Sequence, residues 1–225
     1  MTEARTAIVT GGGRGIGAAV ARALTARGVR VTVFARTAAE VERVVHAGGA
    51  SLAIAGDVRR EADVRRLREE HERVLGPVDL LVNGAGILVR GPAEDLSLEA
   101  FREVLDVNLT GPFLCAREVI PGMKARGRGR IVNVASISGT LGTPLASPYN
   151  ASKWGLIGLT KCLAEELRPA GIQCLSVSPG SVDTAMLAQT PFPPEMAPED
   201  VAKVVVFAAL DAPDAMTGAN MEVFG

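Results

Sequence analysis

The stretch that decides the fold stands near the start of the chain, where Thr6-Ala7-Ile8-Val9-Thr10 runs directly into Gly11-Gly12-Gly13-Arg14-Gly15-Ile16-Gly17. A short apolar run of strand length is followed by a glycine-rich turn, and a helical pattern begins at once. Glycines let backbone N–H groups approach a pyrophosphate, and the helix N-terminus adds a favourable dipole. Many glycine-rich turns only let a strand and a helix pack closely, but this one has the required strand–turn–helix context. The stretch therefore predicts a dinucleotide site, formed by Gly11, Arg14, Gly15, Ile16 and Gly17.

The rest of the chain repeats this alternation of strand-length apolar runs with helical patterns. Strands are predicted at 6–10, 29–34, 51–55, 79–83, 130–135, 172–178 and 220–224, and helices at 16–27, 38–46, 61–75, 98–125, 148–168 and 198–210. Near-continuous apolar runs are typical of strands covered on both faces, and the alternation implies right-handed crossovers. We therefore expect an α/β protein with a single-domain Rossmann fold over residues 1–225: a doubly wound, seven-stranded parallel sheet with helices on both faces. The proline-rich region at about 185–197 is expected to be a lid-like loop over a site.

Composition limits the possible partners. The 225 residues are 48% hydrophobic, and the net charge of −1 argues against a nucleic-acid footprint or attraction to an anionic membrane. No apolar run approaches the roughly 18 residues of a transmembrane helix, and the chain does not begin with a signal-peptide layout, so we expect a cytoplasmic protein. Cys115, Cys162 and Cys174 are expected to be small buried thiols. His46 and His71 lie on charged helical stretches and are expected to be solvated, so no metal site is predicted.

The chain's one tyrosine stands four residues before a lysine, in Tyr149-Asn150-Ala151-Ser152-Lys153. Positions i and i+4 share one face of a helix, so a phenol and an ammonium are expected side by side. A cation about 4 Å away, at an effective dielectric near 20, favours the phenolate by roughly 4 kcal/mol, which is roughly three pKa units. Tyr149 is thus a candidate acid/base near neutral pH. The spacing alone also fits a helical residue beside a surface lysine.

The sequence after the second predicted strand bears on the choice of dinucleotide. NAD-binding sites place an acidic residue there for the ribose 2′-OH. This chain reads Val33-Phe34-Ala35-Arg36-Thr37, with no carboxylate. Arginine suits a 2′-phosphate by charge and fork geometry, and Arg14 offers a second cation. Two exposed surface arginines remain the alternative, but the pattern favours NADP(H) over NAD(H).

Taken together, these motifs resemble the short-chain dehydrogenase/reductase family, in its compact single-domain branch and similar to its 3-oxoacyl-[acyl-carrier-protein] reductase-like members. The resemblance covers essentially all 225 residues. It rests on the turn at 10–17, Asp57-Val58, Asn83-Gly84-Ala85-Gly86, Leu105-Asp106-Val107-Asn108, Ser136 thirteen residues before the tyrosine, Tyr149-x-x-x-Lys153 and Pro179-Gly180-x-x-x-Thr184. Each fragment is modest support, and the ordered set at these spacings is highly specific.

The resemblance implies a role for each matching position. Tyr149 would donate the proton in carbonyl reduction, Lys153 would lower its pKa and bond the nicotinamide ribose, Ser136 would hold the substrate oxygen, and Asn108 would interrupt its helix to hold a water. Ser138, two residues beyond Ser136, is a rival for the oxygen-binding role. The remaining cofactor contacts would come from Asp57 and Val58 at the adenine, Asn83, Ala85 and Gly86 at the adenosine and ribose, and Pro179, Gly180, Val182 and Thr184 at the nicotinamide.

Candidate substrate residues follow the turns that would face the nicotinamide. They are Ile87, Leu88, Val89, Ser138, Leu141, Leu145, Met186, Leu187 and Phe192. This set is mostly apolar and carries no fixed charge, so it predicts a hydrophobic ketone or the neutral end of a 3-oxoacyl thioester and argues against a small dicarboxylate. The resemblance further implies a homodimer or homotetramer formed through the two long helices.

Three functions follow, in order of preference. The first is an NADPH-dependent oxidoreductase that acts on a small-molecule carbonyl or secondary alcohol. The second is an NAD-dependent sugar or polyol dehydrogenase. The third is a non-catalytic NADP(H)-binding sensor, which would have no need of a proton donor.

Overall fold

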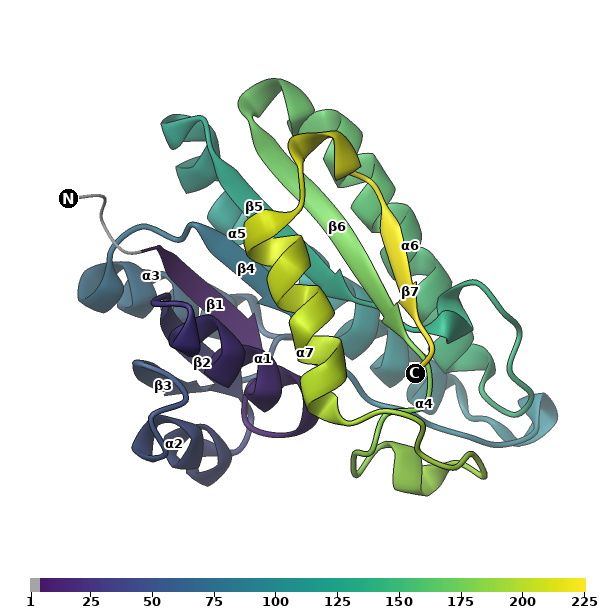
Figure 1. Ribbon diagram of the computed structural model, residues 1–225. Coiled ribbons are helices and arrows are strands. Elements are labelled where there is room, and N and C mark those ends of the chain that lie inside the picture. Colours follow the sequence, from purple (N-terminus) through teal and green to yellow (C-terminus); the bar gives the residue numbers. More distant parts are fainter. Residues whose placement is uncertain (1–4) are drawn as a thin grey trace.

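Seven parallel strands form one sheet in the order β3-β2-β1-β4-β5-β6-β7 (Figure 1). The computed structural model describes residues 5–225. The chain starts at the centre, moves outward to β3, returns to β4 and then moves outward in the other direction, which makes the sheet doubly wound. This confirms the predicted fold. The strands are β1 (Thr6–Thr10), β2 (Arg30–Ala35), β3 (Leu52–Ala55), β4 (Leu80–Asn83), β5 (Gly129–Val134), β6 (Ile172–Pro179) and β7 (Asn220–Val223).

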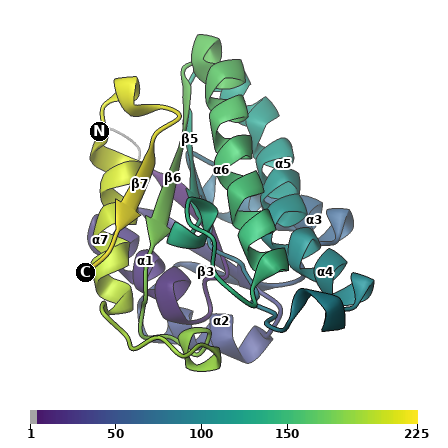
Figure 2. The ribbon, with the colours of Figure 1, turned by 90° about the vertical axis from the view of Figure 1, so that its right-hand side faces the viewer.

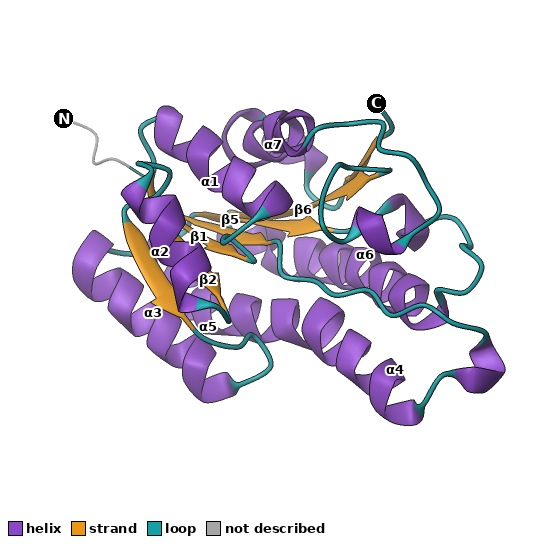
Figure 3. Ribbon diagram, turned by 90° about the horizontal axis from the view of Figure 1, so that it is seen from below, coloured by secondary structure: helices purple, strands orange, loops and turns teal. Residues whose placement is uncertain are grey.

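Helices cover both faces of the sheet (Figures 2 and 3). Residues of α1, α2 and α7 share one core cluster with the sheet, and residues of α3, α5 and α6 share the other. Side chains alternate along a strand, so Ala7 and Val9 of β1 enter the first cluster and Ile8 enters the second. The helices are α1 (Gly15–Ala26), α2 (Ala38–His46), α3 (Glu61–Leu75), α4 (Leu98–Leu105), α5 (Gly111–Arg126), α6 (Ser147–Leu167) and α7 (Pro198–Val206).

The long helix predicted at 98–125 is not continuous. A π-helical turn, η2 (Asp106–Thr110), separates α4 from α5, and a second one, η6 (Phe207–Asp211), follows α7. Such a turn places an extra residue in the helix and often marks a functional site. Asn108 lies in the middle of η2 and is fully buried.

His71 is buried, and the prediction that it is solvated was wrong. The buried residues of α3 are Val64, Leu67, His71 and Leu75. These positions recur every three or four residues, so the histidine stands on the apolar stripe of its helix. One ring nitrogen lies 2.8 Å from the Thr32 hydroxyl and the other 3.1 Å from the Thr6 hydroxyl. Both nitrogens therefore have partners inside the core.

Burial gives His71 a stabilising effect that depends on pH. Desolvation, with a smaller contribution from the Arg30 cation, lowers its pKa to about 4. An unfolded histidine takes up its proton near pH 6.5, so between pH 6.5 and 4 the unfolded chain binds more protons and stability falls as the pH falls. At pH 5 we expect a loss of about 2 kcal/mol relative to pH 7 that His71→Gln does not show. Denaturant unfolding at both pH values measures it, and equal losses in the two proteins would refute it.

Two of the three cysteines are buried as expected. Cys115 and Cys174 lie in the core, but Cys162 is exposed on α6, which corrects the prediction for that residue. Within residues 5–225, none of the helices has the length and apolar character needed to cross a bilayer.

Candidate active site

The glycine-rich turn joins β1 to α1 at the carboxyl edge of the sheet. Gly11 and Gly15 have positive φ angles of 66° and 51°, which favour glycine. A Cβ on Gly11 would come within 2.6 Å of the Gly84 carbonyl oxygen, and a Cβ on Gly17 would overlap the Gly11 carbonyl. Only a chain without these side chains can bring the turn, α1 and the end of β4 so close. The resulting cradle of backbone groups at a helix N-terminus fits a pyrophosphate.

Two other predicted cofactor segments approach this cradle. A Cβ on Gly15 would lie 3.2 Å from the Thr184 methyl, so the loop after β6 meets the glycine-rich turn. A Cβ on Gly86 would lie 3.9 Å from Lys153 Nζ, so the loop after β4 passes beside the lysine. A cleft with a volume of ≈ 210 Å³ lies where these loops meet, lined among others by Ile16, Pro179, Gly180, Val182 and Thr184.

Ser136 and Tyr149 line this same cleft. Ser136 follows β5, and its Oγ accepts a hydrogen bond from the Ser138 N–H at 3.1 Å, which leaves its own O–H to bond the Tyr149 hydroxyl. Tyr149 lies in the first turn of α6. The rival, Ser138, also lines the cleft, but its hydroxyl is engaged with that of Thr143 at 3.1 Å.

Lys153 lies one helical turn beyond Tyr149 and is buried. Its Nζ donates to the Val134 carbonyl at 2.8 Å and lies 5.6 Å from the centre of the Tyr149 ring. Desolvation lowers the pKa of this ammonium to about 8. The amine therefore sits over the ring face, held by the end of β5.

The pKa of Tyr149 is raised, whereas the sequence predicted that it would be lowered. Burial disfavours the phenolate, and the hydrogen bond with Ser136 offsets only part of this effect. The prediction failed because it took account of the neighbouring cation but not of the desolvation of a buried phenol. With the raised pKa, Tyr149 remains a protonated phenol at neutral pH, which suits a proton donor.

Asn108 connects the site to the loop after β4. Its Oδ1 accepts from the Ile87 N–H at 2.8 Å, and its Nδ2 donates to the Ile87 carbonyl at 2.9 Å and to Ser152 Oγ at 3.0 Å. Ser152 in turn donates to the Tyr149 carbonyl at 2.6 Å. Asn108 therefore positions the first turn of α6, and its water-binding role stays a prediction. Sequence analysis missed Ser152, although it stands directly before Lys153.

The adenine-side residues are less exposed than expected. The Asp57 carboxylate is bonded by Arg59 at 2.6 Å, which lowers the pKa of the acid, and Val58 is buried in the core. Asn83 was predicted to line the adenosine, but its side chain is buried in the sheet and its Nδ2 donates to Asn133 Oδ1 at 2.9 Å. Its Nδ2 is therefore committed to β5, whereas its Oδ1 is buried without a partner, and a contact of Asn83 with the adenosine stays a prediction.

A carboxylate that sequence analysis missed lies beside the glycine-rich turn. Glu40, in the first turn of α2, pairs with Arg14 at 3.7 Å and lies against Gly13. Arg14 is therefore partly neutralised. Arg36 is exposed and acts electrostatically on Asp57. Among the described residues, Arg14 forms an ion pair with Glu40, whereas Arg36 forms none and only acts on Asp57 from a distance.

The structure brings part of the predicted substrate set together in the cleft. Leu88, Ser138, Met186, Leu187 and Phe192 line the cleft. The side chains of Leu141 and Leu145 are more than half exposed and do not line it, and Ile87 is turned to the core beside Asn108. Arg90 lines the cleft, so the prediction that no fixed charge faces the substrate was wrong. The loop over 185–197 is closed at its base, where Glu195 and Met196 N–H groups donate to the Ser181 carbonyl.

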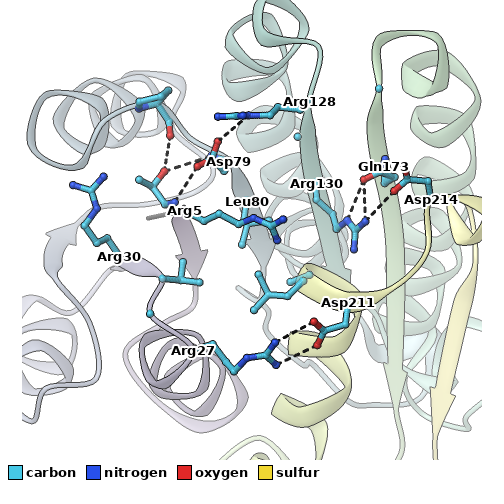
Figure 4. Close-up of a pocket in the computed structure, with 18 of the residues that line it drawn as sticks. Arg5, Arg27, Arg30, Asp79, Leu80, Arg128, Arg130, Gln173, Asp211 and Asp214 are labelled. Carbon is cyan, nitrogen blue, oxygen red and sulfur yellow. Dashed lines mark hydrogen bonds and ion pairs between the residues drawn. The ribbon is translucent and has the colours of Figure 1, made fainter. Parts of the chain in front are cut away.

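A larger cleft, with a volume of ≈ 1150 Å³, lies at the opposite, amino edge of the sheet (Figure 4). Arginines and aspartates from the strand starts and helix ends line it, as in the pairs Arg27–Asp211 at 3.0 Å and Arg130–Asp214 at 3.4 Å. In an α/β fold the helix C-termini meet at this edge, and cations there offset their negative dipole ends. No residue predicted for catalysis or binding lines this cleft.

The fold and the site together are those of a dinucleotide-binding oxidoreductase. A phosphate cradle follows the first strand, and two hydroxyl groups lie beside a buried lysine at the same carboxyl edge of the sheet. The chain belongs to the short-chain dehydrogenase family, whose model matches residues 5–192.

Relatives within this family differ in their substrates. The chain is 39% identical to a 3-alpha-(or 20-beta)-hydroxysteroid dehydrogenase from Mycobacterium tuberculosis, over 98% of this chain and 88% of that protein. It is 37% identical to a cis-4-hydroxycyclohexanecarboxylate dehydrogenase from Sinomonas cyclohexanicum, over 98% and 95%. The crystal structure of a 3-ketoacyl-(acyl-carrier-protein) reductase from Brucella melitensis complexed with NADH superposes with a TM-score of 0.93 at 32% identity, over 99% of this chain and 98% of that one.

Proposed function

We propose that the protein is an NADP(H)-dependent oxidoreductase that interconverts a carbonyl and a secondary alcohol, with a hydrophobic ketone or a 3-oxoacyl thioester as substrate. The observation that carries this proposal is the placement of the Ser136 and Tyr149 hydroxyl groups in one cleft, next to the buried amine of Lys153. A buried amine costs folding free energy, and titratable groups perturbed in this way cluster at functional sites, which argues against a non-catalytic sensor. The likeness to a 3-ketoacyl reductase supports the substrate class.

The chain's own residues account for the proton and the charge in this reaction. A nicotinamide dinucleotide, when bound at the glycine-rich turn, supplies the hydride and its electron pair. Ser136 holds the carbonyl oxygen through its O–H and stabilises the charge that develops there. Tyr149 gives its phenolic proton to that oxygen, which completes the alcohol and leaves a phenolate. The positive charge of Lys153 stabilises this phenolate until solvent returns the proton.

The proposed preference for NADPH depends on Arg36. A charge-assisted hydrogen bond contributes about 1.5–3 kcal/mol, so Arg36→Asp is expected to lower the ratio of kcat/KM with NADPH to kcat/KM with NADH by at least about tenfold. The matched control is Arg43→Asp, an exposed arginine on α2, which should leave the ratio unchanged. An unchanged ratio in Arg36→Asp would remove the basis of the preference.

A second candidate, an NAD-dependent dehydrogenase, is favoured by Glu40. This carboxylate stands beside the glycine-rich turn and partly neutralises Arg14, so it would repel a 2′-phosphate and could accept from a ribose 2′-OH. A wild-type preference for NADH, together with a loss of NADH affinity in Glu40→Gln, would establish this candidate instead.

The reaction itself is tested by cofactor consumption. We would measure the oxidation of NADPH, with NADH alongside, on 3-oxoacyl thioesters, cyclic and aromatic ketones and quinones, and the reverse reaction on the matching alcohols. Turnover confined to thioesters assigns an acyl-chain reductase, and turnover on free ketones assigns a broader carbonyl reductase. Tight cofactor binding with no turnover in either direction would favour the sensor.

We also propose a homodimer or homotetramer in the cytoplasm. Trp154 on α6 and Phe113 on α5 are 55% and 42% exposed, which is unusual for such large apolar groups on neighbouring helices and supports assembly through these helices. The other apolar residues of these helices, such as Leu114, Ile157 and Leu163, are buried in the subunit. Buried, unpaired Cys115 and Cys174 suit a reducing compartment. Light scattering in solution reads out the assembly.

A further inference from the structure

Arg90 is the one charged side chain among the described residues that line the catalytic cleft. It belongs to the loop between β4 and α4. Its Nη2 donates to the Pro144 carbonyl at 3.4 Å, and its guanidinium carbon lies 6.0 Å from the centre of the Phe192 ring. Arg90 therefore spans the loops that follow β4, β5 and β6, at the mouth of the cleft.

The charge of Arg90 is not compensated by the protein. Over residues 5–225, neither an aspartate nor a glutamate lines the cleft, and no ion pair involves Arg90. A guanidinium has five N–H donors, and the contact with Pro144 uses one. The remaining donors sit on a side chain that is only partly exposed and already braced by an aromatic ring, so little freedom is lost when they bind.

The neighbours of Arg90 separate it from the cofactor cradle. Pro144 and Phe192 belong to the loops that carry the catalytic serine and the apolar substrate residues. The glycine-rich turn, in contrast, lies between β1 and α1 and offers its own backbone donors. The contacts of Arg90 thus place it on the side of the cleft formed by the predicted substrate loops.

We propose that Arg90 forms an anion subsite at the mouth of the catalytic cleft, so that the preferred substrate is a ketone or secondary alcohol bearing a carboxylate or phosphate away from the reacting carbon. This inference rests on the proposed carbonyl–alcohol function and narrows its substrate class. The anion could be the carboxylate of a small oxo acid or the phosphate of a thioester's pantetheine arm. Both accept paired hydrogen bonds from a guanidinium.

The test compares substrates that share a ketone and differ in charge. One pair is 5-oxohexanoate and its methyl ester, and the other is acetoacetyl-4′-phosphopantetheine and acetoacetyl-pantetheine. We expect kcat/KM to favour the anionic member of at least one pair by about tenfold, as for a partly exposed charge-assisted hydrogen bond. In Arg90→Met this ratio should fall to about one, whereas Arg90→Lys should keep part of it. The pair that shows the preference identifies the source of the anion.

A general loss of activity in a variant lowers kcat/KM for both members of a pair equally, so the ratio of the two values is unaffected by it. The matched control is Arg65→Met, an exposed arginine on α3 outside the cleft, which should keep the wild-type ratio. A ratio near one for both pairs in the wild type, or a preference that survives Arg90→Met, overturns the anion subsite and leaves the proposed function intact. If no ketone is turned over, the proposed function fails. Calorimetric titration of cofactor-loaded protein with hexanoate against hexanamide, and with phosphopantetheine against pantetheine, then decides the subsite alone.

Discussion

Replacing Tyr149 by phenylalanine is expected to lower kcat by about a hundred- to ten-thousandfold, the usual effect of losing a positioned general acid. In the proposed reaction the phenol gives up the proton, and burial keeps it protonated at neutral pH. Phenylalanine keeps the ring and its packing against Lys153 and removes only the hydroxyl. Cofactor affinity and the midpoint of thermal unfolding should therefore change little. Steady-state turnover and cofactor titration on the same preparation measure both quantities.

Substitutions of Ser136 and Ser138 test which of the two hydroxyl groups holds the substrate oxygen. The Ser136 hydroxyl is hydrogen-bonded to Tyr149, whereas the Ser138 hydroxyl is engaged with Thr143. Ser136→Ala should therefore also lower kcat, while Ser138→Ala serves as the matched control and should change it far less. Wild-type turnover in Tyr149→Phe would refute the assigned proton donor, and a larger effect at Ser138 than at Ser136 would transfer the oxygen-binding role to the rival.

The sheet and its phosphate cradle could be predicted because they depend on local sequence. A buried parallel strand requires an apolar run, and the turn after β1 requires glycine where φ is positive or where a Cβ would meet a carbonyl, as at Gly11 and Gly17. Each of these constraints acts on residues that are consecutive in the sequence. The order of the strands follows from the alternation with helices and the right-handed crossover rule.

Features that depend on tertiary contacts could not be predicted from the sequence. Glu40 and Arg90 are ordinary charged residues in the sequence, and only the packing of α2 and of the loops around the cleft brings them to the site. His71 was missed because a polar residue on an apolar stripe resembles a solvated one until Thr6 and Thr32 supply its partners. The interruption of the helix at Asn108 was implied by the family resemblance, but no local breaker marks it, and the side-chain bonds that stabilise the π-helical turn come from Ile87 in another loop.

The direction of the pKa shift of Tyr149 also depends on tertiary structure and could not be predicted from the sequence. Spacing on a helix correctly placed a lysine one turn from the phenol, but it could not say where the ammonium points. The Val134 carbonyl at the end of β5 attracts Nζ, and burial then governs the phenol. The net direction of the pKa of Tyr149 is therefore set by its burial, which the sequence does not show.

Lys153→Met is expected to abolish most turnover and at the same time stabilise the protein. Burial lowers the pKa of Lys153 to about 8, against about 10.4 in an unfolded chain. Below pH 8 the amine is charged in both states, and the folded state bears a desolvation cost of about 3 kcal/mol. Between pH 8 and 10.4 the unfolded chain binds more protons, so wild-type stability rises with pH over this window. Methionine fills a similar volume without the charge.

The gain is reduced by the partner that Lys153 leaves behind. The Val134 carbonyl loses a hydrogen bond, which costs about 1 kcal/mol, so we expect Lys153→Met to be about 2 kcal/mol more stable at pH 7, with the advantage shrinking toward pH 10. Denaturant unfolding at pH 7 and pH 10 measures this, and Lys161→Met, an exposed lysine on the same helix, should stay within about 0.5 kcal/mol of the wild type. A destabilised Lys153→Met would mean that the amine holds the end of β5 to α6 more strongly than its burial opposes folding. A stabilised but inactive one would show that this site keeps a buried charge for its chemistry at the expense of its fold.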